Sequence, residues 1–267
     1  MGDMRKFTVI YYGYMRQCPT TIHSHLEQLY LHFPDARCVF SVWGRLWDCS
    51  PLDHPRFDLP ASQEYLPRWL DSRLAAWSVH QPDQDGMQEL VRASSIPATN
   101  CFGQQTWRVA SYCRSLQDAS RTALSSSTDE YFLYCRPDLR FDTEFKPHIP
   151  DGCDCASNCG IDWFPDGSRR IGQAPVKGMN KNFLDQLFFA NRRCVERIST
   201  LFDELPNLHR KGVEVNYETL VGWHLHGAGL RWTAANLAHV SLIRPRGVVN
   251  DRMHILYPTG VGPAVEH

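Results

Sequence analysis

The sequence predicts an α/β protein whose central sheet is mostly parallel and flanked by helices. Two observations carry this prediction. Runs of five or six mostly apolar residues recur along the chain, and such runs are typical of strands covered on both faces. The first two runs are separated by a segment with helical periodicity. This is the pattern of a β-α-β unit with a parallel, right-handed crossover.

The first half of the chain contains this β-α-β unit. Residues 6–12 and 38–43, which are mostly apolar, are the predicted strands, and residues 19–33 between them carry apolar side chains at helical spacing, with Thr20 or Thr21 as a cap. Residues 44–62 contain three prolines and are expected to form a loop. The spacing of apolar residues predicts a helix over 64–79, followed by an irregular connection over 80–99.

The second half is expected to begin with a long helix at 102–124 and a buried strand at 131–135, followed by an irregular cysteine-rich insert at 143–180. Two further helical segments, at 183–202 and 217–229, and a last strand at 240–243 complete it.

Size and composition indicate one globular domain. The chain has 267 residues, of which 43% are hydrophobic and 21% charged, enough to bury a sizeable core. We expect a single domain over residues 1–246 and a C-terminal tail over 247–267. Lys and Arg total 28 against 29 Asp and Glu. A nucleic-acid-binding protein normally has a basic excess, so we expect no such partner.

The sequence also bears on the cellular compartment. No apolar stretch approaches the roughly 20 residues that cross a bilayer. The first apolar run is too short for a signal peptide and is soon followed by Gly13 and Arg16. We therefore expect a cytoplasmic protein without a transmembrane segment, whose ten cysteines are reduced thiols.

The most informative segment is the end of the apolar run 131–135. The run stops at Arg136-Pro137-Asp138, and Pro137 cannot donate to a sheet ladder. Arg136, Asp138 and Asp142 should then lie at the carboxyl end of a central strand, where open α/β sheets bind their ligands. An arginine beside carboxylates suits a phosphate-bearing ligand, with Asp138 and Asp142 as oxygen ligands for a divalent cation. The alternative is a salt-bridged strand end.

Three other positions are candidates. Gly13 and Arg16 follow the first strand, where a glycine permits close backbone approach and an arginine reaches a phosphate, although many such glycines are simple turns. Asp185 could act as a general base, or as the N-cap of a helix. Glu218 could be a site carboxylate, or a first-turn acid that favours the helix dipole.

A soft-metal site is the remaining candidate. Cys153, Cys155 and Cys159 follow His148, and structural zinc takes thiolates and imidazole. A second cysteine pair is missing and Cys-x-Cys is tighter than the usual spacing, so reduced loop cysteines are the alternative. The sequence contains no G-x-S-x-G elbow, P-loop or G-x-G-x-x-G fingerprint, which disfavours hydrolases, NTPases and dinucleotide oxidoreductases.

Five segments, in this order, resemble those of bacterial and viral glycosyltransferases that build polysaccharide or lipopolysaccharide chains. They are IYYGYMR at 10–16, VFSVW at 39–43, EYFLYCRPDLRF at 130–141, LDQLFF at 184–189 and YETLVGWHLHGAGL at 217–230. The chain departs from the family pattern at Leu184, where an asparagine is common. It also lacks a strict Asp-x-Asp, and its cysteines 153–159 are not part of the pattern.

The resemblance implies a GT-A-like fold that binds a nucleotide-diphosphate sugar. Asp138 then stands where such enzymes keep their metal or sugar carboxylate, and Asp185 and Glu218 become site residues instead of helix-end residues. We expect Arg16 and Arg136 to steady the diphosphate, with manganese or magnesium at Asp138 and Asp142. Asp185 would face the acceptor hydroxyl, with Glu218 as the second candidate.

The predicted function is transfer of a hexosyl or deoxyhexosyl group to a glycan or lipid-linked acceptor. A lipid-linked acceptor would bring the protein to a membrane surface as a peripheral protein. Two alternatives remain open. One is a non-catalytic nucleotide-sugar or glycan-binding protein on the same scaffold, and the other is a zinc-stabilised interaction module centred on Cys153 to Cys159.

Overall fold

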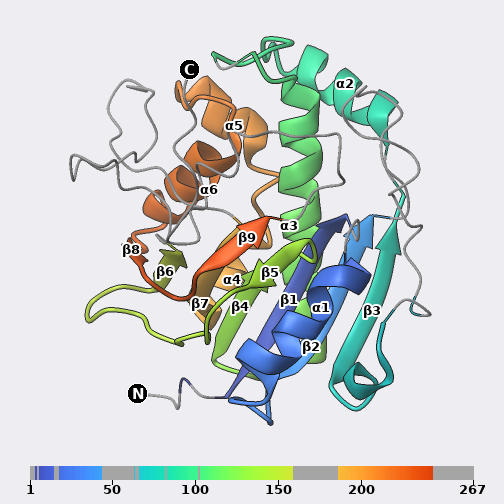
Figure 1. The fold of residues 1–267 in the computed structure, drawn as a ribbon. Helices are drawn as coiled ribbons and strands as arrows, with labels where there is room; N and C mark the ends of the chain where they lie inside the picture. The colour runs from blue at the N-terminus through green and yellow to red at the C-terminus, as the bar shows by residue number, and fades with distance from the viewer. Residues whose placement is uncertain are drawn as a thin grey trace, which may run out of the picture.

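The protein is an α/β protein built on a mixed, mostly parallel sheet. The computed structural model describes residues 4, 6–14, 18–43, 63, 66–81, 83–101, 103–158 and 186–242. Within these residues, seven strands form one sheet in the order β3-β2-β1-β4-β7-β6-β8, and helices cover both of its faces (Figure 1). The predicted fold class, a mostly parallel sheet flanked by helices, is confirmed at this level.

The first part of the sheet is parallel. β1 (Phe7–Tyr14) lies between β2 (Arg37–Trp43) and β4 (Tyr131–Cys135), and β3 (Leu74–His80) pairs with the outer side of β2. All three pairings are parallel, so the carboxyl ends of the four strands meet at one edge of the sheet. The strands predicted at 6–12, 38–43 and 131–135 are confirmed.

The second part of the sheet contains one reversed strand. β7 (Leu187–Asn191) runs antiparallel to β4 on one side and to β6 (Cys155–Asn158) on the other. β8 (Trp232–Ala235) then pairs in parallel with β6. Because β7 is reversed, it begins at the edge where β4 ends.

Two hydrophobic cores lie on the two faces of the sheet. Successive side chains of β1 pack into the two cores in turn: Val9 and Tyr11 lie in one core, and Ile10 and Tyr12 lie in the other. The first face is covered by α1 (Cys18–His25), the π-helical turn η1 (Leu26–Tyr30) and a small sheet of β5 (Leu139–Phe141) and β9 (Val240–Leu242). The second face is covered by α3 (Thr106–Ser126), α4 (Arg192–Ile198) and α6 (Tyr217–His226).

The predicted helices over 19–33, 102–124 and 217–229 are confirmed by α1 with η1, by α3 and by α6. The last strand is confirmed by β9. A short helix, α5 (Leu205–Arg210), and the strand β8 have no counterpart among the predicted elements. In the described part of the chain, no helix combines the length and the apolar character that crossing a membrane requires.

Two predictions about the segment between β2 and α3 were wrong. The helix predicted over 64–79 is instead a single 3-10 turn, η4 (Arg68–Leu70), followed by β3. The irregular connection predicted over 80–99 contains the helix α2 (Gln84–Ala93), whose first turn is capped by Asp83 accepting from the Gly86 amide at 2.9 Å. β3 is an edge strand with almost every residue half-buried, so it lacks the alternating pattern that marks a strand.

The predictions for 143–180 and 183–202 were partly wrong in the parts that the structure describes, residues 143–158 and 186–202, and the residues between these parts lie outside the described residues. The insert contributes β6 to the central sheet, and the apolar residues expected to lead into a helix form β7. Leu187, Phe188, Phe189 and Ala190 are all buried, because β7 is covered on both faces. A short apolar run of this kind cannot be distinguished from a buried helix by periodicity alone. The helix itself starts only at Arg192.

Candidate functional site

The sheet has a topological switch point between β1 and β4. From β1 the chain proceeds to β2 and β3 on one side, and then returns through α3 to place β4 on the other side of β1. In open α/β sheets, ligands bind in the crevice outside the carboxyl ends of strands at such a point. The side chains that follow β1 and β4 are therefore the first candidates for a site.

Arg136 and Asp138 follow β4 and form a two-pronged ion pair. The Arg136 Nε donates to one Asp138 carboxylate oxygen at 3.0 Å, and Nη2 donates to the other at 2.7 Å. The Asp138 side chain is only 1% exposed, whereas that of Arg136 is 22% exposed. The salt-bridged strand end that the sequence left open is thus present, and it holds one cation and one anion side by side at the switch point.

Gly13 lies at the carboxyl end of β1 with a φ of +84°, a conformation that favours glycine. Its amide donates to Ser115 Oγ of α3 at 3.1 Å. A Cβ at this position would meet no atom within 4 Å, so backbone conformation and not space requires the glycine. Arg16, the other candidate after β1, lies outside the described residues.

The start of β7 meets the end of β4 at the same edge. The Arg136 amide donates to the Gln186 carbonyl at 3.3 Å, so Gln186 lies directly beside the residue that follows β4. Asp185 itself lies outside the described residues. The alternative role of Asp185 as a helix N-cap required a helix in the apolar segment that follows it, and that segment is β7.

Glu218 belongs to the first turn of α6, and its side chain lies outside the described part of the structure. The N-cap of this helix is Asn216, whose side chain accepts from the Thr219 amide at 2.7 Å. Its first turn is connected to β1 through aromatic rings. Tyr217 packs edge-on against Tyr112 of α3 at 4.9 Å between ring centroids, and Tyr112 contacts Tyr12 of β1 at 6.1 Å.

Asp142 is not brought together with Asp138. The two residues flank the extended strand β5, which at about 3.3 Å per residue separates them by roughly 10 to 13 Å along the chain. Asp142 pairs with its own arginine, with Arg140 Nε donating to its carboxylate at 2.8 Å. Two ligands of one cation must converge within a few ångström. We therefore keep Asp138 alone as the candidate cation ligand.

Among the described residues, no group of three or more His, Cys, Asp or Glu side chains is placed to hold a metal ion. Cys155 is fully buried in β6, where burial and the neighbouring Cys194 thiol raise its pKa well above the usual value. A thiol with a raised pKa is a poor metal ligand, because metals bind the thiolate. His148 is exposed, and Cys159 lies outside the described residues.

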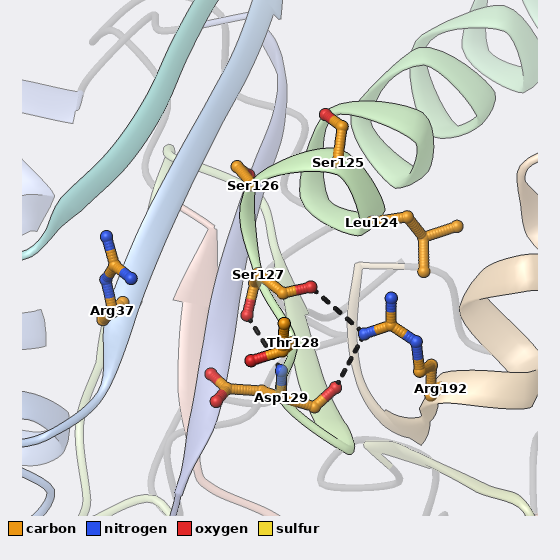
Figure 2. A pocket seen from close by; sticks show the side chains of 8 residues that line it. All are labelled: Arg37, Leu124, Ser125, Ser126, Ser127, Thr128, Asp129 and Arg192. Atoms are coloured by element: carbon orange, nitrogen blue, oxygen red, sulfur yellow. Dashed lines mark hydrogen bonds between the residues drawn. The ribbon is translucent and has the colours of Figure 1, made fainter.

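A hollow of about 290 Å³ lies at the opposite edge of the sheet, where α3 ends and β4 begins. Figure 2 shows its lining, which includes Arg37 and Arg192. Arg192 Nη1 donates to the carbonyls of Ser127 and Asp129 at 3.1 and 3.2 Å, which fastens the turn between α3 and β4 to α4. This arginine has a structural task, and the carbonyl end of α3 disfavours an anion there. We assign no ligand to this hollow.

The sequence did not identify two residues that hold the backbone of residues 137–139, just after β4, in place. Thr21 and His25 of α1 are completely buried and hydrogen-bond to the backbone on either side of Asp138. Their spacing of four residues places them on one helix face, and this is the signal that could have identified them. The sequence pattern suggested only a cap for Thr21 and no role for His25.

Comparison with known proteins adds no family. No protein-family model matches the chain, and a search of curated proteins finds no match either. The function is therefore argued from the geometry of the switch point and from the residues around it.

Proposed function

We propose that the protein is a glycosyltransferase of GT-A-like fold that transfers a hexosyl or deoxyhexosyl group from a nucleotide-diphosphate sugar to a hydroxyl of a glycan or lipid-linked acceptor. One observation carries the proposal. The Arg136–Asp138 pair lies at the switch point of an open α/β sheet, where such sheets bind nucleotides. The order of the five resembling segments supports the same function.

The ion pair suits a diphosphate donor because each of its two charged side chains can bind a group of the ligand in place of its present partner. Arg136 would turn from the carboxylate to the diphosphate, for which a planar guanidinium is the preferred partner. Asp138 would then accept from sugar hydroxyls or bind a cation. Removing one partner alone would leave the other charge buried and unpaired, which is costly. The arrangement therefore favours a ligand that supplies both charges together.

The site offers a divalent cation, manganese or magnesium, only one protein ligand. Asp138 offers one carboxylate, and hard cations accept carboxylate oxygens together with substrate phosphates and water. When bound, the cation would neutralise the negative charge that develops on the departing diphosphate. Asp138 would hold it, and Arg136 would share the stabilisation of the diphosphate.

The remaining roles come from the resemblance. Asp185 would take the proton from the acceptor hydroxyl, with Glu218 as the second candidate, and Arg16 would bind the diphosphate together with Arg136. The position of Gln186 beside Arg136 supports the involvement of the segment that leads into β7. Gly13 would let the donor approach the end of β1.

The first experiment is a binding screen. The purified protein is titrated with UDP-glucose, GDP-mannose and dTDP-rhamnose, each with and without manganese, and the melting temperature and binding heat are recorded. Release of the nucleoside diphosphate is then followed with candidate glycan acceptors. We expect one donor to raise the melting temperature and to be turned over.

The decisive variant is Asp138→Asn, which keeps the shape of the side chain and removes its charge. We expect it to lose donor binding and transfer. Asp203→Asn is the control, since Asp203 also pairs with an arginine, Arg121, at 2.7 Å, but both of these side chains are exposed. Undiminished turnover in a folded Asp138→Asn protein would refute the proposal. Binding without diphosphate release under any condition would favour the non-catalytic nucleotide-sugar-binding protein.

A further inference from the structure

The buried polar face of α1 holds the backbone on both sides of Asp138. Thr21 Oγ1 donates to the Pro137 carbonyl at 2.5 Å, and His25 Nε2 contacts the Leu139 carbonyl at 2.6 Å. Both side chains are completely buried. Asp138 therefore lies between two carbonyls that are anchored to the same helix.

A third contact extends this attachment along β5. Ser24, which lies between Thr21 and His25 in α1, accepts from the Phe141 amide at 2.9 Å and donates to the Thr21 carbonyl at 2.6 Å. The Phe141 ring and the His25 imidazole pack edge to face at 4.8 Å between centroids. The segment from Pro137 to Phe141 is thus held at three backbone positions by one helix.

The partners of His25 determine which ring nitrogen carries its proton. A carbonyl can only accept, so Nε2 carries the hydrogen and donates to Leu139. Nδ1 is then the acceptor for the Tyr11 hydroxyl at 2.8 Å, and this hydroxyl in turn accepts from Tyr30 at 3.3 Å. Burial lowers the pKa of His25 to about 4, which is consistent with a neutral ring. Both ring nitrogens are satisfied, so the imidazole is fixed in one orientation.

This fixed attachment limits how Asp138 can move. With the carbonyls of its two neighbours held, the remaining freedom of Asp138 lies largely in its side-chain torsions. In the proposed function the Asp138 carboxylate exchanges Arg136 for the donor, and the held backbone fixes where that carboxylate begins. A site that is held in place in advance binds more tightly, because less ordering is needed upon binding.

We propose that Thr21 and His25 are positioning residues for Asp138, which hold the backbone on either side of it so that its carboxylate meets the donor in one orientation. This inference rests on the proposed donor-binding role of Asp138. It assigns a task to two buried polar residues of α1 that hydrogen-bond to the backbone on either side of Asp138.

The alternative is that these are ordinary buried polar side chains which only stabilise the fold. His224 of α6 provides the matched control. It is also completely buried, and burial also lowers its pKa to about 4. Its Nε2 contacts the Arg197 carbonyl at 2.8 Å, so it connects α6 to α4 and does not hold residues 137–141. Replacing it should cost stability without affecting Asp138.

The test uses removal and rescue variants at each position. Thr21→Val and His25→Leu remove the donors, whereas Thr21→Ser and His25→Gln keep a group that can donate. His224→Leu is the control. Amide hydrogen exchange of residues 138–141 is measured without any ligand, and the dissociation constant is measured for the member of the UDP-glucose, GDP-mannose and dTDP-rhamnose panel that binds the unmodified protein most tightly.

We expect residues 138–141 to exchange about tenfold faster in the two removal variants, because each loses one backbone anchor. Donor binding should weaken by a similar factor. The two rescue variants should stay within about twofold of the unmodified protein in both measurements. The His224→Leu control should leave both unchanged while lowering the melting temperature. Thr21→Val keeps the test decisive if His25→Leu does not fold.

Two results would overturn the inference, and they differ from each other. If the unmodified protein binds a donor and the removal variants bind it equally well, Thr21 and His25 have no positioning role while the proposed function stands. If the unmodified protein binds no donor of the panel, the proposed function fails, and the positioning role falls with it even where hydrogen exchange is accelerated.

Discussion

Acidification should destabilise the protein through His25, and the effect has a defined size. Burial lowers its pKa from the ordinary 6.5 to about 4, so between these values the unfolded chain binds a proton that the folded chain does not. Stability therefore falls as the pH drops from 6.5 towards 4. Lowering the pH from 7 to 5 should cost about 2 kcal/mol through this residue.

The measurement compares urea unfolding of the unmodified protein and of His25→Gln at several pH values, with tryptophan fluorescence as the signal. Other groups titrate over the same range, so the difference between the two proteins isolates His25. The free energy of unfolding should fall by about 2 kcal/mol less in the variant between pH 7 and pH 5. His224→Gln should show a similar change, since its pKa is also lowered to about 4. Parallel pH profiles for His25→Gln and the unmodified protein would refute the reasoning.

Two further predictions concern the candidate site. Asn216→Ala removes the side chain that caps α6 and should lower the free energy of unfolding, measured with urea, by about 1 kcal/mol. The control is Glu89→Ala at an exposed position, which should leave the free energy of unfolding unchanged. Gly13→Ala should cost about 1 to 2 kcal/mol in the same assay, because alanine must adopt a positive φ at a position with room for its methyl group. A neutral Gly13→Ala variant would show that the backbone there can relax.

The parts of the fold that could be predicted were those with one clear signal. The runs at β1, β2 and β4 are mostly apolar because these strands are covered on both faces, and their positions were confirmed. The edge strand β3 could not be recognised, since it has one neighbour and is only half-buried. Phe188 and Phe189 of β7 are both buried, so their spacing did not distinguish a strand from a helix.

The candidate site was predictable in part for a similar reason. Proline at 137 ends β4, so Arg136 and Asp138 were correctly expected at the end of a central strand. Their ion pair was predicted only as the alternative to a ligand site, because which side chains pair depends on the three-dimensional structure. Thr21 and His25 were not recognised as partners of this segment, since their contacts cross more than a hundred residues of sequence.

The central position of β1 has a consequence for synthesis of the protein. β1 pairs with β2 on one side, and its other side pairs with β4, as in the register of Thr8 with Phe132. At about 5 to 20 residues per second, β4 would leave the ribosome roughly 6 to 25 seconds after β1. During this interval one ladder of β1 has no native partner, and an apolar strand with an open edge is prone to aggregate. The chain therefore passes through a stage at which chaperone binding should be most useful, before residue 131 is made.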